Sequence, residues 1–150
     1  MKTINTEKAL LAYNLLNTAS YSKMSDGDKI KIFKITRALK PIAVSYEEAS
    51  KDAAEKMKFE NFNDRIQKAQ EYERNKKEGK KGPISEKEYK NTVKDLMEYD
   101  KLVKDTIKQL GSKEETIDVD LLSEDGFGSL MASNDWTMGQ VMSVSDIVCE

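Results

Sequence analysis

The sequence predicts a mainly α-helical protein, an elongated antiparallel helical bundle with a minimal two-stranded sheet. Apolar residues recur at three- and four-residue steps over long stretches, which is the spacing of one helix face. Only two prolines and seven glycines interrupt them, and 35% of the residues are charged, as suits helices with narrow apolar stripes. A length of 150 residues is typical of one domain, so we expect a single helical domain over residues 1–150.

The N-terminal residues predict a short strand that leads into a helix. The segment from Lys2 to Asn5 contains the β-prone residues Thr3 and Ile4. Thr6 is a suitable N-cap for a helix from about Glu7 to Thr18. The apolar face of this helix carries Leu10, Tyr13 and Leu16.

The longest helix is expected to begin at the capping pattern of Ser25 and to run to about Met57. Pro41 interrupts it, and proline removes one helical hydrogen bond and crowds the preceding turn. Because the apolar stripe continues in phase beyond Pro41, the sequence favours a kink over a break.

Two further helices flank a lysine-rich turn near residues 78–84. The first extends from about Asn63 to Lys77, and the second from Ser85 to about Leu110, with Gly111 placed as its C-terminal cap. The turn contains two glycines and a proline, so we expect it to be flexible and solvated.

The last forty residues, 111–150, form an acidic segment of a different kind. From Thr116 to Leu121 apolar and acidic residues alternate, which predicts a half-buried strand. A lone strand leaves its backbone groups unpaired, and the partner available nearby within the chain is Lys2 to Asn5. A short helix from Ser123 to Ser133 and a last helix capped by Thr137 are expected to follow.

The two long helices are expected to pack antiparallel around one hydrophobic core. The predicted core positions are Leu39, Ile42, Tyr46, Val93, Leu96 and Val103.

Charge is distributed unevenly along the chain. Residues 1–110 carry 24 basic and 18 acidic residues, a net charge of +6, whereas residues 111–150 carry one lysine and nine acids, a net charge of −8. Either the acidic segment folds back onto the basic helices, or surfaces of opposite sign meet between copies of the chain.

The composition argues against an enzyme. The chain has no histidine, which excludes the Ser-His-Asp and Cys-His arrangements and the usual zinc sites. Its one cysteine, Cys149, lies next to the C-terminus and has no partner base, and no phosphate-binding glycine loop is present. We therefore expect no catalytic residue and no cofactor.

Two charged clusters each allow a functional and a structural interpretation. The acidic cluster consists of Asp118, Asp120, Glu124 and Asp125. Its carboxylates could bind a hard cation, but their spacing does not match a calcium-binding loop. The solvent-exposed face of a strand explains them more simply. The basic cluster consists of Arg74, Lys76, Lys77, Lys80 and Lys81. It could contact phosphates, but glutamates are interleaved with these residues. This favours the solvated tip of a helical hairpin over a nucleic-acid-binding surface.

The single tryptophan is surrounded in sequence by other large apolar residues. Aromatic and methionine side chains of this kind are typical of cores and also of binding surfaces. The candidate interaction residues are Trp136, Met131, Met138, Met142 and Phe127. Both interpretations, core filling and interface anchor, stay open at this point.

Two segments, KITRALKPIAVSYEEASKDAAEKM and TIDVDLLSEDGF, together with the order of the expected elements, resemble a family of small proteins of tailed bacteriophages and prophages whose function is not established. The resemblance covers most of the chain outside residues 58–85. It implies a viral origin and a setting in the host cytoplasm, and it brings no catalytic motif.

The leading expectation is a non-enzymatic phage protein that acts through protein–protein contacts, as an assembly factor or small structural component. Its partner would be another protein or a second copy of the chain, with no membrane and no nucleic acid involved. The alternative is a phage inhibitor of host defence that binds a host protein or a nucleotide signal. A nucleotide binder needs a pocket rich in Arg, Lys and aromatic residues, whereas an assembly protein needs an exposed apolar surface.

Overall fold

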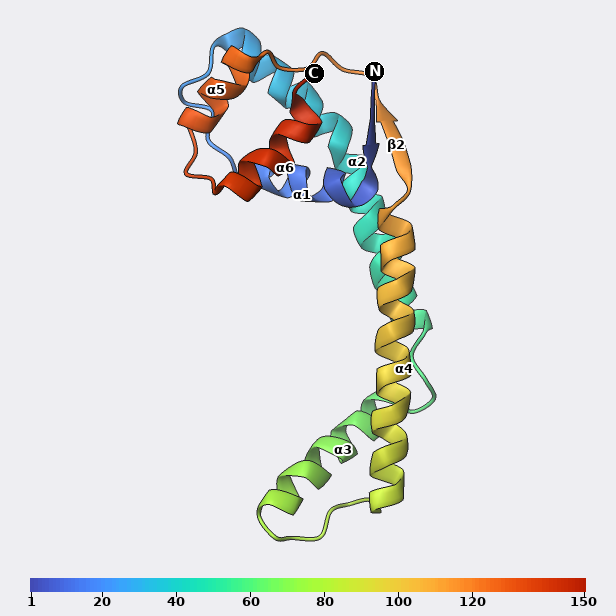
Figure 1. Ribbon diagram of the computed structural model, residues 1–150. Helices are drawn as coiled ribbons and strands as arrows, with labels where there is room; N and C mark the ends of the chain where they lie inside the picture. Colours follow the sequence, from blue (N-terminus) through green and yellow to red (C-terminus); the bar gives the residue numbers. More distant parts are fainter. The chain divides into compact units, whose positions relative to one another are not determined.

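The computed structural model describes residues 1–150 and contains six helices and one two-stranded antiparallel sheet (Figure 1). The mainly α prediction is therefore confirmed. The elements in chain order are β1 (Lys2–Asn5), α1 (Thr6–Asn17), α2 (Asp26–Lys56), α3 (Phe62–Lys77), α4 (Glu86–Gly111), β2 (Glu114–Ile117), α5 (Glu124–Ala132) and α6 (Met138–Val148). None of the helices combines the length and the apolar character that crossing a membrane requires.

The chain forms two compact units. The first unit consists of residues 1–50 and 108–150, and the second unit consists of residues 51–107. The N- and C-terminal parts of the sequence thus belong to one unit, and the middle of the chain forms the other. The expectation of one domain over the whole chain stays a prediction.

The sheet joins the start of the chain to the acidic segment. β1 and β2 pair antiparallel, with Lys2 opposite Ile117 and Asn5 opposite Glu114. The predicted partner is confirmed, but the predicted boundaries of the second strand, Thr116 to Leu121, are wrong. Because β1 has only four residues, its pairing partners run out at Ile117. The chain then continues to Leu122, whose N–H donates to the Val148 carbonyl at 2.7 Å.

The start of α1 differs from the prediction by one residue. The side chain of Asn5, not Thr6, caps the helix, and it accepts hydrogen bonds from the backbone N–H groups of Glu7 and Lys8. Thr6 is buried, and both its hydroxyl (2.6 Å) and its N–H (2.9 Å) donate to the Lys113 carbonyl. Since β1 runs directly into α1, the last strand residue takes the capping position, and Thr6 instead fastens the helix to the entry of β2.

α2 continues without a break through Pro41, as the phase of the apolar stripe predicts. Asp26 and Asp28 occupy its first turn, where carboxylates interact favourably with the helix dipole. Pro41 itself is exposed, so its ring meets solvent and not the core.

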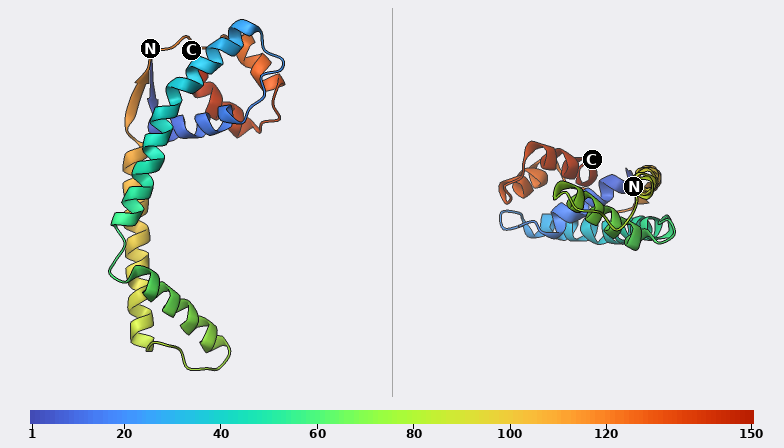
Figure 2. Two further views of the ribbon diagram at one scale, coloured as in Figure 1. Left: turned by 180° about the vertical axis from the view of Figure 1, so that it is seen from behind. Right: turned by 90° about the horizontal axis from the view of Figure 1, so that it is seen from below.

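The core of the first unit is formed by β1, β2, α1, the first part of α2, α5 and α6 (Figure 2). α1 and α6 lie close together, and the completely buried Ala9 and Ala12 of α1 are small enough to allow this approach. The largest completely buried side chains are Leu16, Ile32, Ile35, Leu39, Leu122, Leu130, Val144, Ile147 and Val148.

The prediction of a single core that contains both long helices is wrong. Leu39 is completely buried in the first unit, and Ile42 and Tyr46 are half-buried there. Val93, Leu96 and Val103 belong to the second unit and are only half-buried, because that unit consists of the end of α2, α3 and most of α4 and has too few elements to cover them.

Aromatic packing takes the place of an aliphatic core in the second unit. Phe62 lies 4.7 Å from both Phe59 and Tyr99, measured between ring centroids, and the Tyr99 hydroxyl donates to the Ala54 carbonyl at 2.8 Å. Arg65 covers the Phe59 ring and forms a 2.8 Å ion pair with Asp95. These contacts hold α3 and α4 together.

Gly111 has a different role from the predicted helix cap. It is the last residue of α4, it is buried, and it does not adopt a positive φ. A Cβ atom at this position would lie 3.0 Å from the Tyr46 hydroxyl and 3.1 Å from the Glu7 Cβ. Glycine thus leaves room for the close approach of Tyr46 and Glu7 within the first unit. The residue with a positive φ (71°) in the lysine-rich turn is Gly79.

We expect the two leucines to respond differently to truncation. Leu39→Ala should lower the free energy of unfolding by about 2–5 kcal/mol, because it leaves a cavity in a closed core. Leu96→Ala should cost less than about 2 kcal/mol, because its side chain is only half-buried. Chemical denaturation measures both free energies of unfolding. Equal losses in the two variants would contradict a fully buried core in the first unit and a partly exposed one in the second.

Removal of residues 1–5 should expose the backbone of β2. We expect faster amide exchange at residues 114–117 in the truncated chain, because their hydrogen-bond partners in β1 are gone. The amides of α3, in the second unit, serve as the internal control and should keep their rates. Unchanged exchange in β2 would mean that the sheet does not form in solution.

Candidate functional site

The link between α5 and α6 is held in place by local caps and by one asparagine. Ser123 caps α5, and Thr137, the predicted cap of α6, forms a capping box with Gln140. The Asn134 carbonyl oxygen accepts from the Ser20 N–H at 2.8 Å, and its amide donates to the carbonyls of Ser20 (2.8 Å) and Leu130 (2.9 Å). The link is thus fastened to the loop that joins α1 to α2.

The structure divides the predicted interaction residues into two groups. Phe127 is buried in the core of the first unit, and Trp136 is half-buried against the same core. Met131, Met138 and Met142 are exposed, with 38%, 73% and 60% of their surfaces accessible. Core filling is therefore the role of Phe127 and, in part, of Trp136, whereas the methionines are free to meet another molecule.

Met138 and Met142 share one face of α6, because four residues make about one helical turn. Asp146 continues this face by one more turn and is exposed, and the exposed Asp135 precedes the helix. We call Met138, Met142 and Asp146 the α6 face. No basic residue occurs after Lys113, so the α6 face is apolar with an acidic margin.

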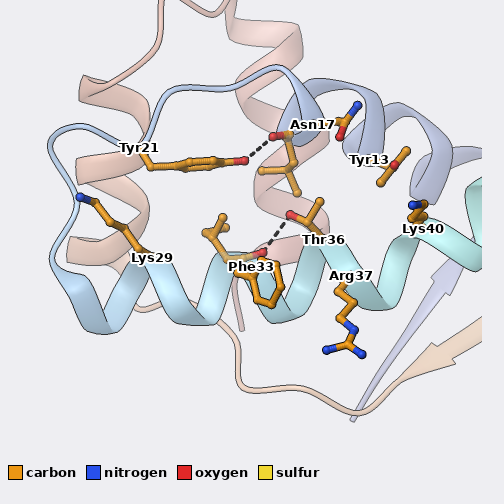
Figure 3. A pocket seen from close by; sticks show the side chains of 10 residues that line it. Tyr13, Asn17, Tyr21, Lys29, Phe33, Thr36, Arg37 and Lys40 are labelled. Carbon is orange, nitrogen blue, oxygen red and sulfur yellow. Dashed lines mark hydrogen bonds between the residues drawn. The ribbon is translucent and has the colours of Figure 1, made fainter.

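A groove between α1, the following loop and α2 is the second candidate site, and sequence reasoning missed it (Figure 3). Its volume is about 480 Å³. Its lining residues are Tyr13, Leu16, Asn17, Tyr21, Lys29, Ile32, Phe33, Thr36, Arg37 and Lys40. Leu16 and Ile32 form its apolar base and are almost completely buried.

Three cationic side chains and no carboxylate line this groove. The Tyr21 hydroxyl donates to the Leu16 carbonyl, which fixes the ring across the groove. Burial raises the pKa of the Tyr21 hydroxyl, which favours the neutral form that donates this bond. A recurrence of basic and aromatic residues at positions 29, 33, 37 and 40, beside the buried stripe of α2, is the signal that would have indicated the groove.

Cys149 lacks the surroundings of a reactive thiol. Burial raises its pKa above the ordinary value for cysteine, and neighbouring Lys2 and Ser145 offset this only in part. The neutral thiol is the weaker nucleophile, so the environment works against covalent chemistry at this residue.

The charged clusters noted in the sequence do not form enclosed sites. Asp118, Asp120, Glu124 and Asp125 are exposed, and no group of three or more Asp, Glu or Cys side chains gathers in an arrangement for a metal ion. The basic cluster lies at the end of α3 and in the turn that follows, and its side chains are exposed as well.

Comparison with known proteins adds no functional assignment. The chain matches no family model, and neither a curated protein nor a solved structure matches it. The two candidate sites therefore rest on the chemistry and geometry of their own residues.

Proposed function

We propose that the chain is a non-enzymatic phage protein of the host cytoplasm that acts through protein–protein contacts, as an assembly factor or small structural component. The observation that carries this proposal is the pair of exposed methionines on the α6 face. The resemblance of its sequence to small phage proteins supports the viral setting.

Methionine suits a binding surface because its unbranched, polarisable side chain adapts to different partners. Full burial of one such side chain contributes about 1.5–3 kcal/mol. With 73% and 60% of their surfaces accessible, Met138 and Met142 have most of this contribution still to gain. A contact that covers both would therefore have a substantial apolar part.

The charges around the α6 face favour a basic partner, and a second copy of the chain fits. Residues 111–150 carry a net charge of −8 and residues 1–110 a net charge of +6, so acidic and basic surfaces of two copies attract each other. Such complementarity mainly accelerates and orients the encounter, while apolar contacts set the lifetime of the complex.

The proposal predicts self-association that depends on the α6 face. We expect the double variant Met138→Ser/Met142→Ser to raise the dissociation constant by about tenfold or more, since apolar area is lost. Analytical ultracentrifugation at several concentrations and two salt levels measures the dissociation constant. Low salt should accelerate association, because charges are screened less.

Met97→Ser is the matched control, because Met97 is 68% exposed but lies on α4 in the second unit. It should leave the dissociation constant unchanged. A chain that stays monomeric at every concentration, or two variants with equal effects, would contradict association through the α6 face.

A further inference from the structure

The groove between α1 and α2 holds positive charge that the protein itself does not neutralise. None of Lys29, Arg37 and Lys40 forms an ion pair, although seven ion pairs occur elsewhere in the chain. Because no carboxylate is among the lining residues, all three cations attract an anion that enters the groove. A concave site lined by one sign of charge concentrates ligands of the opposite sign.

Aromatic rings lie among these cations. Phe33 follows Lys29 by one helical turn and precedes Arg37 by another, so the ring lies between the two charges along α2 (Figure 3). Its side chain is 62% exposed, which is unusual for so large an apolar group. Tyr13 from α1 and Tyr21 from the loop add two more rings.

Neutral polar groups complete the lining. The Thr36 hydroxyl donates to the Ile32 carbonyl at 2.8 Å, so its oxygen can still accept a hydrogen bond. Asn17 is exposed, and its side-chain amide can both donate and accept a hydrogen bond. Such groups recognise the edge of a heterocyclic ring.

From this combination we propose that the groove binds a nucleotide, with its phosphates on the neighbouring Arg37 and Lys40 and its base against the Phe33 and Tyr21 rings. Cations select the phosphate, ring faces select the base, and a volume of about 480 Å³ lies within the range of about 300–1,000 Å³ that small-molecule sites occupy. This inference is independent of the proposed function, because the groove and the α6 face share no residue.

The test uses the full chain and isothermal titration calorimetry with ADP, GDP, adenosine and inorganic phosphate. We expect ADP or GDP to bind, with adenosine and inorganic phosphate at least about tenfold weaker, because each offers only one of the two recognised groups. Raising the salt concentration should weaken nucleotide binding. No binding of either nucleotide at millimolar concentration would overturn the proposal, and so would inorganic phosphate binding as tightly as the nucleotides.

Exposed positions allow variants that keep the fold. Arg37→Gln/Lys40→Gln should weaken nucleotide binding by about tenfold or more, and Phe33→Ala should weaken it severalfold. Lys34→Gln is the matched control, since Lys34 is exposed on α2 but does not line the groove. Circular dichroism checks the fold of each variant.

Equal affinities in all these variants would place the nucleotide elsewhere and overturn the proposal. Tighter binding of a single-stranded oligonucleotide than of any mononucleotide would overturn it as well, since a polymer would then be the ligand. The variant Met138→Ser/Met142→Ser should bind nucleotide normally, which separates a failure of this inference from a failure of the proposed function.

Discussion

The antiparallel pairing of β1 with β2 organises the first unit, although it involves only four residues of each strand. It brings the beginning of α1 to the end of α4, where Thr6 donates twice to the Lys113 carbonyl. With α1 fixed at that point, α1 and α6 pack closely together in one core, where Ala9 and Ala12 are completely buried. The sheet thus places the acidic segment beside the N-terminal helix.

Helices could be predicted from the sequence where their signals are local. The capping box of Thr137 and Gln140, the ends of α3 and the continuation of α2 through Pro41 all depend on residues within a few turns of one another. The end of β2 could not be predicted in this way, because it depends on the length of β1, more than a hundred residues away.

The difference between the buried core of the first unit and the half-buried apolar residues of the second unit could not be predicted from the sequence, for a similar reason. Val93 and Leu96 recur at helical spacing just as Leu39 does, but periodicity reports which face is apolar and not how much protein covers it. Of the candidate site, the exposed methionines were among the predicted residues, whereas the groove depends on α1, the loop and α2 meeting in space.

The side-chain amide of Asn134 hydrogen-bonds to both the N–H and the carbonyl of Ser20, as the backbone of a neighbouring strand would. Aspartate has the same shape but cannot donate, so it would place a carboxylate against two carbonyl oxygens. During evolution this position should therefore resist even its closest substitute, for reasons of architecture alone. Asn134 lies two residues from Trp136, so its invariance would easily be mistaken for selection on binding. Relatives with aspartate at this position would contradict the expected invariance.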